Sequence, residues 1–106
     1  MKIGSFTPAA PVVLAPMAGV TNAPFRTMCR RFAPGLVYVN EMVMATAVVH
    51  GNSKTERMMT FSADEQPRSL QVYGSDPVML GEAIRKVCAA GMVDHIDITS
   101  AARPPR

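Results

Sequence analysis

The sequence predicts an α/β fold in which parallel strands form a sheet and helices lie outside it. Short apolar runs alternate with segments of helical periodicity, in the order strand, helix, strand, helix, strand, helix, strand. That alternation is typical of parallel βαβ units with right-handed crossovers. Hydrophobic residues make up 48% of the 106 residues, which is ample for a packed core and argues against a disordered chain.

Residues 12–32 predict the first strand and the first helix. Residues 12–15 (VVLA) form a continuous apolar run, as in a strand buried on both faces, and Pro16 ends it. Thr21 or Asn22 can cap the helix that follows, and Pro24 suits its first turn. Four apolar residues recur at helical spacing and are expected to face the core: Phe25, Met28, Cys29 and Phe32.

The next stretch predicts a second strand and a second helix. Residues 36–39 (LVYV) are rich in β-formers and lead into residues 40–42 (NEM), which we place at the carboxyl end of the strand. Residues 43–49 are apolar and predicted to be helical, and a turn follows at residues 50–52. Residues 53–66 are predicted to be an irregular polar segment.

The last third of the chain predicts a third strand, a third helix and a fourth strand. Residues 69–73 (SLQVY) form the strand, which Gly74 closes. Asp76 can cap the helix, Pro77 opens it and Gly91 stops it. Its apolar stripe is expected to comprise Leu80, Ile84, Val87 and Cys88. Residues 95–98 begin the fourth strand.

This order of elements fits two architectures. One is a doubly wound open sheet, and the other is the N-terminal half of a (βα)8 TIM barrel. A complete barrel typically needs about 250 residues, so on the second interpretation the chain is less than half of a domain.

The cysteines and histidines show no spacing typical of metal ligands or of a redox pair. Cys29 and Cys88 lie far apart at apolar helical positions, so we expect two buried thiols, no disulfide and a reducing cytosol. His50 and His95 lack partners at metal-ligand spacing. We expect no metal site.

No uninterrupted apolar run is long enough for a signal-peptide core or a membrane span, because prolines break the N-terminal stretch. We therefore expect a soluble cytoplasmic protein without a membrane partner. The formal charge of +3 includes Arg103 and Arg106, and without these two the basic side chains exceed the acidic ones by one. This is weak evidence for a nucleic-acid partner, and the cluster Arg26, Arg30 and Arg31 is expected to be a solvated helix face.

Chemistry in parallel α/β folds gathers at the carboxyl ends of strands. Three such stretches stand out here: residues 16–21 (PMAGVT), residues 40–42 and residues 71–74 (QVYG). Gly19 permits close backbone approach to a flat ligand, and Gln71 offers both a donor and an acceptor. Taken singly, each stretch is better explained structurally, as a tight turn, a helix-start carboxylate at Glu41 or a solvent-facing strand end.

Other site motifs are missing from the sequence. It contains no GxGxxG, GxxxxGK[ST] or HExxH, which excludes the usual dinucleotide, P-loop and zinc-protease sites.

Together, the segments VVLAPMAGVTNAPFR, VNEMV and PRSLQVYGSDP resemble the N-terminal part of bacterial tRNA-dihydrouridine synthases, over residues 12–98. Asn22 departs mildly from the aspartate common in that family. The resemblance implies a flavin-bearing (βα)8 barrel followed by a helical tRNA-binding domain. It also implies that Pro16, Met17 and Ala18 lie against the isoalloxazine of FMN and that Gln71 bonds its polar edge.

The same resemblance implies a reaction. NADPH reduces FMN, hydride passes to C6 of a uridine in tRNA, and a cysteine protonates C5. The uridine has to leave the base stack to reach the flavin, so the substrate is expected to be a flipped base.

The last eight residues depart from the family. Where it reads Asn-Phe-Gly-Cys-Pro-Ala-Pro-Lys, this chain has residues 99–106 (TSAARPPR), so that Ala102 stands at the proton-donor cysteine. If the family's eight residues are written with the codons AAC TTC GGC TGC CCG GCC CCC AAG, chosen to fit, then deleting one A from the first codon reproduces all eight residues of this chain when the next codon begins with G. We therefore expect residues 1–98 to be a partial flavin-binding domain and residues 99–106 to be an out-of-frame tail. The C-terminal helical domain is expected to be absent, and the chain to be inactive as written.

Three alternatives stay open at this level. A small non-catalytic α/β RNA-binding module would need a basic face, which the charge balance disfavours. Another FMN-dependent barrel oxidoreductase would lack the Gly-Cys-Pro motif downstream. A non-functional truncated product would be unstable and free of flavin.

Overall fold

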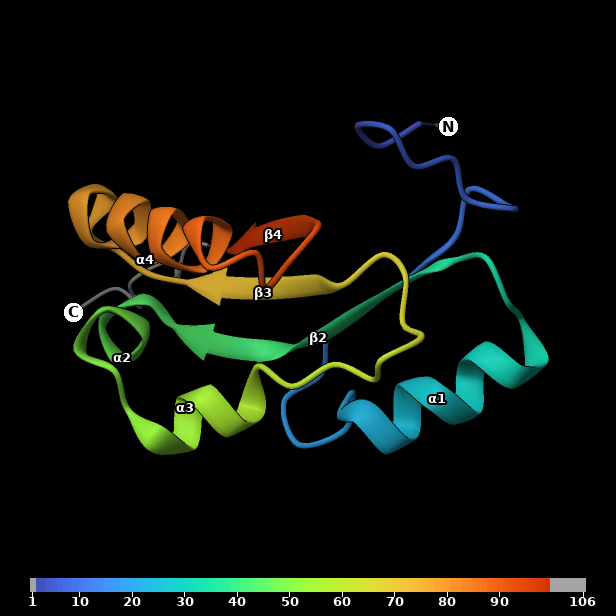
Figure 1. Ribbon diagram of the computed structural model, residues 1–106, viewed down its shortest axis with the longest axis horizontal. Helices are drawn as coiled ribbons and strands as arrows, with labels where there is room; N and C mark the ends of the chain where they lie inside the picture. Colours follow the sequence, from blue (N-terminus) through green and yellow to red (C-terminus); the bar gives the residue numbers. More distant parts are fainter. Residues whose placement is uncertain (1, 100–106) are drawn as a thin grey trace, which may run out of the picture.

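The structure, a computed structural model, describes residues 2–99. Of the expected out-of-frame tail only Thr99 falls in this range, and the other seven residues lie outside the described part. The elements are β1 (Val13–Leu14), α1 (Ala23–Phe32), β2 (Val37–Met44), α2 (Ala45–His50), α3 (Ser53–Met58), β3 (Ser69–Tyr73), α4 (Pro77–Ala89) and β4 (His95–Thr99). Figure 1 shows their arrangement.

The four strands are parallel and lie in the order β1-β2-β3-β4, so each strand pairs with its neighbours in the sequence. A doubly wound sheet reverses its strand order at a switch point, whereas a barrel adds each strand beside the preceding one. The strand order therefore confirms the α/β fold and, of the two architectures, supports the (βα)8 barrel.

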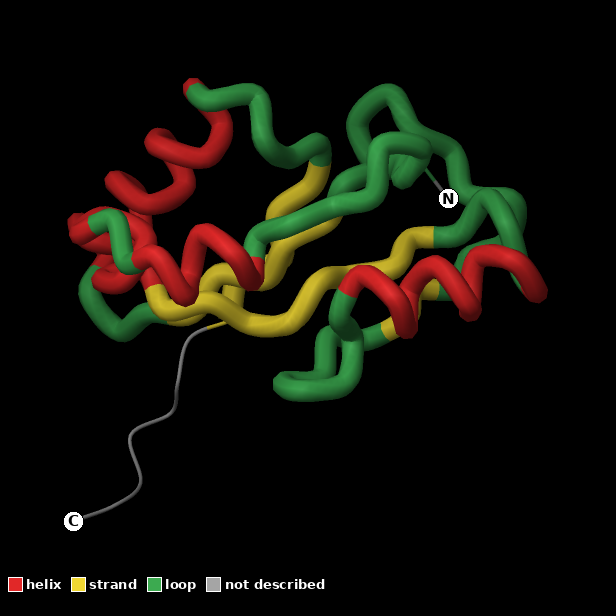
Figure 2. The backbone as a smooth tube through the Cα atoms, turned by 60° about the horizontal axis from the view of Figure 1, so that its bottom comes forward, coloured by secondary structure: helices red, strands yellow, loops and turns green. Residues whose placement is uncertain are grey.

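The main hydrophobic core lies between β3 and the helices α2 and α4, which pack against each other. Leu70 and Val72 of β3 are fully buried and, two residues apart, face the same side of the sheet. Figure 2 shows the helices around the strands. The core consists of Val43, Ala45, Val48, Met59, Leu70, Val72, Ala83 and Val87. Gln71 lies between Leu70 and Val72, so its side chain faces the opposite side of the sheet.

Helix α4 begins as its sequence predicts. The Asp76 side chain accepts a hydrogen bond from the Val78 N–H at 2.9 Å, and Pro77 occupies the first turn. Gly91 has a φ of +66°, a backbone conformation that favours glycine just after a helix end.

The expectation of two buried thiols is wrong for Cys88, which is exposed, while Cys29 is half-buried; both cysteines are free. Helix α4 buries Ala83 and Val87. Consecutive helical residues are rotated by about 100°, so burial of Val87 turns Cys88 toward solvent.

Helix α1 is capped by Asn22, whose side chain accepts from the Phe25 N–H at 3.0 Å. Its expected apolar face is not the buried one, since Met28 is 53% exposed and Phe32 is 86% exposed. The only fully buried residue of α1 is Arg26. The expectation that Arg26 belongs to a solvated face is therefore wrong, because its guanidinium faces polar groups of the segment that precedes β3.

Strand β2 is longer than predicted and runs on through Asn40 and Glu41 to Met44. Its register with β3 shifts between Asn40 and Val43. Such a bulge lets a strand keep pairing while it re-aims side chains. Residues 40–42, expected at the carboxyl end of the strand, thus lie in its middle.

Residues 53–66 are not wholly irregular, because they contain α3. The Asn52 side chain caps it by accepting from the N–H groups of Lys54 and Thr55, at 2.9 and 3.2 Å. Helix α3 is short and mainly polar, so it lacks the apolar period that predicts helices.

Strand β4 extends one residue further than predicted. Thr99 pairs with Tyr73, and its carbonyl accepts from the Gly74 N–H at 3.3 Å. The first residue of the expected out-of-frame tail is therefore paired within the sheet.

Candidate functional site

The candidate site comprises the loop that follows β1 and side chains of the neighbouring strands β2 and β3. The segment between β1 and α1, residues 15–22, is here called the β1–α1 loop. It contains Pro16, Met17 and Ala18, which the sequence singles out, whereas Gln71 lies in the middle of β3. Strand β2 lies between β1 and β3, so it separates the two parts of the site.

The β1–α1 loop is closed by the hydroxyl of Thr21. This oxygen accepts from the Met17 N–H at 3.0 Å and donates to the Met17 carbonyl at 3.2 Å. Thr21 is fully buried, whereas Met17 is 42% exposed and Ala18 is also exposed. The loop thus presents Met17 and Ala18 outward on a turn that is anchored from inside.

A second anchor comes from β2. The Gly19 N–H donates to Oε2 of Glu41 at 2.6 Å. Gly19 has a φ of +75°, which side-chain-bearing residues rarely adopt. Glu41 is therefore not a helix-start carboxylate; it links β2 to the loop.

Gln71 has a defined partner across the sheet. Its amide Nε2 donates to Oδ2 of Asp97 at 2.6 Å, and the two residues are register partners on β3 and β4. A carboxylate can only accept hydrogen bonds, so the amide nitrogen of Gln71 must turn toward it. The amide oxygen of Gln71 is left pointing away from Asp97.

His95 is engaged in a neighbouring cross-strand contact. Its Nδ1 lies 2.5 Å from the Oγ of Ser69, its register partner on β3. No group of three or more His, Cys, Asp or Glu side chains among residues 2–99 comes together as metal ligands. Nor does any helix in this range have the length and hydrophobicity to cross a membrane.

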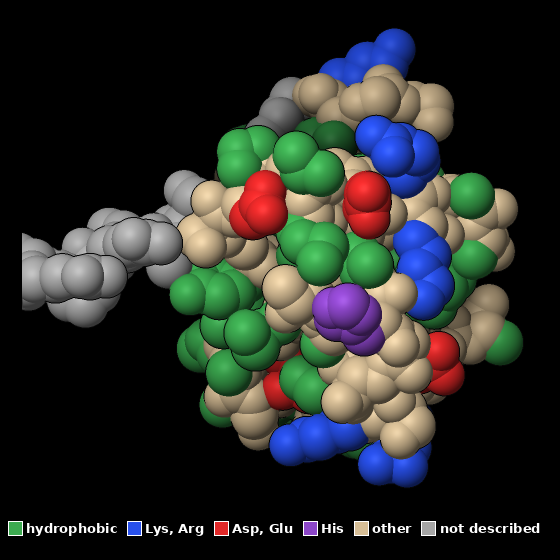
Figure 3. Space-filling view, turned by 90° about the vertical axis from the view of Figure 1, so that its left-hand side faces the viewer, with side chains coloured by type: hydrophobic (Ala, Val, Ile, Leu, Met, Phe, Trp, Pro, Cys, Tyr) green, Lys and Arg blue, Asp and Glu red, His purple; other side chains and the backbone are tan. Residues whose placement is uncertain are grey.

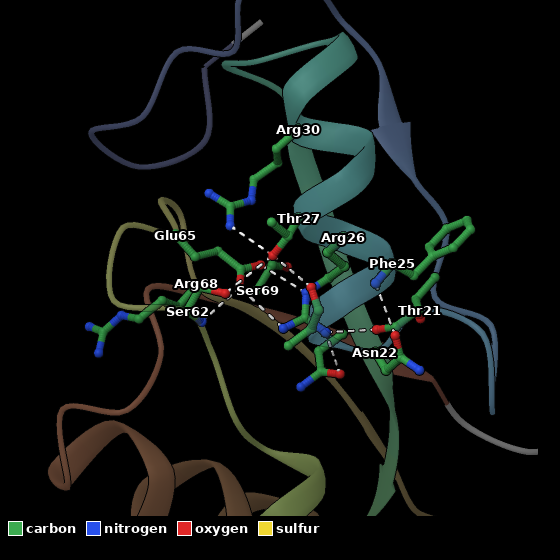
Figure 4. A network of polar contacts seen from close by, with 12 residues as sticks. Thr21, Asn22, Phe25, Arg26, Thr27, Arg30, Ser62, Glu65, Arg68 and Ser69 are labelled. Atoms are coloured by element: carbon green, nitrogen blue, oxygen red, sulfur yellow. Dashed lines mark hydrogen bonds and ion pairs between the residues drawn. The ribbon is translucent and has the colours of Figure 1, made fainter.

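The structure also reveals a buried polar cluster that the sequence does not predict, drawn in Figure 4. Arg26 is fully buried and forms a bidentate ion pair with Glu65, with Nε to Oε2 at 2.8 Å and Nη2 to Oε1 at 3.1 Å. Its Nη1 donates to the Thr21 carbonyl and to Oδ1 of Asn40. Arg26 and Glu65 lie 39 residues apart, so no local pattern could have paired them.

Figure 3 looks at the end of the molecule that carries α2 and the ends of β2 and β3. Hydrophobic, acidic and basic side chains are mixed on this face. In the part of the chain coloured there, no broad basic surface appears, which agrees with the small net charge.

A parallel sheet whose strands follow one another in order, with a glycine-containing loop and polar side chains toward its carboxyl end, defines the class of (βα)8-type α/β proteins. The family model described as dihydrouridine synthase (Dus) matches residues 13–100. The chain belongs to the dihydrouridine synthase family.

Several curated relatives support this assignment. A probable tRNA-dihydrouridine synthase of Mycobacterium tuberculosis (strain ATCC 25618 / H37Rv) is 46% identical over 112 residues, which cover 100% of this chain and 29% of the relative. The tRNA-dihydrouridine synthase B of Pseudomonas aeruginosa is 41% identical over 86 residues, covering 81% of this chain and 26% of the relative. The chain thus spans between a quarter and a third of the length of these relatives. No solved structure matches it significantly.

Proposed function

We propose that this chain is the part of an FMN-dependent tRNA-dihydrouridine synthase that contacts one face and one polar edge of the flavin. The observation that supports this most directly is the contact between Gln71 and Asp97. It gives a single orientation to an amide at the position that, by family resemblance, bonds the flavin edge.

The chemistry of these side chains fits the proposed group. The polar edge of an isoalloxazine presents an N–H between two carbonyl oxygens. The Gln71 amide oxygen can accept from that N–H, while its amide nitrogen retains one further N–H for a carbonyl. Pro16, Met17 and Ala18 offer a small, mostly apolar surface of the kind on which a flat ring packs. When bound, FMN would carry hydride from NADPH to C6 of a tRNA uridine.

In this scheme the residues of this chain would bind and orient the flavin and would not transfer a proton. The β1–α1 loop would support the ring face, and Asp97 would hold the amide of Gln71. At Ala102, the position of the family's proton donor, a methyl group has no proton to give to C5 of the uridine. We therefore propose that the chain as written does not turn over.

The proposal also covers domain organisation and location. Residues 1–98 would be part of the flavin-binding barrel, residues 99–106 an out-of-frame tail, and the family's helical tRNA-binding domain would lie outside these 106 residues. The phosphate of a barrel cofactor is commonly bound by loops after the seventh and eighth strands, so FMN should bind this chain weakly. Two free cysteines support a reducing, cytoplasmic location.

A flavin titration tests the site. FMN fluorescence and absorbance are followed as the 106-residue chain is added, with the Gln71→Leu variant alongside. The matched control is Gln66→Leu, the same change at an exposed glutamine outside the site. We expect saturable binding that Gln71→Leu weakens and Gln66→Leu does not. Equal binding by all three proteins, or no binding by any, would contradict the proposed site.

A further inference from the structure

Arg26 is the most completely bonded side chain of the described structure, and its bonds lead to the candidate site. A guanidinium has five N–H donors. Nε bonds Oε2 of Glu65 at 2.8 Å, and Nη2 bonds Oε1 of Glu65 at 3.1 Å and the Thr60 carbonyl at 3.0 Å. Nη1 bonds the Thr21 carbonyl at 2.7 Å and Oδ1 of Asn40 at 2.8 Å. All five donors are used, so Arg26 has none left for a ligand.

The burial of this pair calls for an explanation other than stability. The side chains of Arg26 and Glu65 are 0% and 1% exposed. Removing two charges from water offsets much of their attraction, and well-packed apolar residues are often at least as stable in their place. What a bidentate ion pair adds is direction, since a planar guanidinium can satisfy its acceptors only in one arrangement. The Phe61 ring, with its centroid 5.2 Å from Cζ, further restricts the guanidinium.

The first path from Arg26 to the loop passes through Thr21. The Thr21 carbonyl accepts from Nη1, while the Thr21 hydroxyl both donates to and accepts from the Met17 backbone. The residue that closes the β1–α1 loop is thus itself held in place by Arg26. Figure 4 shows the guanidinium directed from α1 toward Thr21 on one side and Glu65 on the other.

The second path passes through β2. Oδ1 of Asn40 accepts both from Arg26 and from the Glu41 N–H, the latter at 2.7 Å. The Glu41 carboxylate then accepts the Gly19 N–H. This path lies where the register of β2 shifts, between Asn40 and Val43. Asn40 and Glu41 are successive residues of the strand, and successive side chains point to opposite faces of a sheet, so one can bond Arg26 of α1 and the other the β1–α1 loop.

We propose that Arg26, with Glu65, is a positioning residue that sets the place of the β1–α1 loop through both Thr21 and Glu41. Its effect on flavin rests on the proposed function, whereas its effect on the loop does not. Lysine cannot replace it, because an ammonium group cannot reproduce the planar fork that bonds Glu65, Thr21 and Asn40 together.

Amide hydrogen exchange of the 106-residue chain tests the loop. We compare the wild type with Arg26→Lys and with Arg68→Lys, which changes the exposed ion pair to Asp94 in the same way. In Arg26→Lys the Gly19 and Thr21 amides should exchange faster by roughly tenfold or more, about the worth of one hydrogen bond to a charged group. The Leu70 amide in the core should change less. Arg68→Lys should leave the loop amides as in the wild type.

Two further measurements keep the outcome decisive. If Arg26→Lys does not fold, Glu41→Ala removes only the second path and should accelerate exchange at Gly19 alone. A Val87→Ala variant provides a core-destabilised reference, because Val87 is buried far along α4. The amide exchange rates of the β1–α1 loop are compared between the variants. If they rise no more in the Arg26 or Glu41 variants than in Val87→Ala, Arg26 only contributes to overall stability and the inference fails.

The FMN titration separates this inference from the proposed function. If the wild type binds FMN, Arg26→Lys should weaken binding more than Val87→Ala does and should alter the bound-flavin absorbance spectrum. If Arg26→Lys speeds amide exchange in the loop but leaves the FMN affinity and the bound-flavin spectrum unchanged, Arg26 has no role in flavin binding. If the wild type binds no FMN, the proposed function fails, while the exchange data still decide whether Arg26 positions the loop.

Discussion

Gln71 and Asp97 face each other on adjacent parallel strands, and the amide nitrogen of Gln71 lies 2.6 Å from the carboxylate of Asp97. Because a carboxylate accepts and never donates while ionised, it selects one of the two orientations of the amide. The amide oxygen is then available for a donor on a ligand. Asp97 on β4 thereby determines which hydrogen-bonding groups Gln71 on β3 presents to a ligand.

Asp97→Asn should weaken FMN binding without unfolding the chain. The new amide can offer either its oxygen or its nitrogen, so the amide of Gln71 would no longer be held in one orientation. We expect a loss of affinity of roughly tenfold, or about 1.4 kcal/mol, by fluorescence titration. Asp94→Asn, the same change on the exposed pair before β4, serves as the control. Equal affinities for the two variants would count against the assigned role of Asp97.

Removing one partner of the buried ion pair Arg26–Glu65 should lower the stability of the fold more than replacing both partners with apolar residues. Glu65→Leu leaves the Arg26 charge buried without its partner, and we expect about 3–5 kcal/mol less stability in urea unfolding. The double variant Arg26→Met with Glu65→Leu leaves no buried charge and should regain part of that loss. A double variant less stable than Glu65→Leu alone would show that the pair itself stabilises the fold.

Acid should weaken the contact that fastens β4 to the segment before β3. Hydrogen bonds from the Arg68 side chain, and then from its backbone N–H, lower the pKa of Asp94 from its ordinary value near 3.8. A lowered pKa means that this stabilisation is complete above the ordinary value and is lost as the pH falls through the folded one. Because both side chains are about a third or more exposed, we expect less than about 1 kcal/mol. Denaturant midpoints of Asp94→Asn and wild type should converge as the pH falls through the folded-state pKa of Asp94; a constant difference would contradict this cause.

The chain should self-associate in solution. Strands β1 and β4 are the edges of a parallel sheet, and Val13 and Ile98 on them are 45% and 56% exposed. Exposed strand edges with apolar side chains are templates for pairing between molecules. Sedimentation velocity should show mass rising with concentration, and Ile98→Lys should reduce that rise. A monomer with a sharp cooperative melt would contradict this expectation and the partial-barrel interpretation with it.

Much of the fold follows from local sequence. Asn22 and Asp76 cap α1 and α4, and residues 69–73 form β3 as their composition predicts. These features depend on neighbours within a few residues, which is the range over which capping bonds and side-chain periodicity act. The family motif likewise is readable from the order of short segments.

The helical face of α1, the bulge in β2 and the partner of Arg26 depended on tertiary structure. Phe32 satisfies the apolar period of α1 and yet is exposed, while Arg26 lies outside that period and is buried. Sequence alone determined that this chain is a parallel α/β member of its family, with Pro16, Met17, Ala18 and Gln71 as its candidate site. Only tertiary structure decided how that site is held, because a buried charge is stable only where its hydrogen-bonding groups all find partners, and here Glu65 supplies two of these hydrogen bonds from 39 residues away.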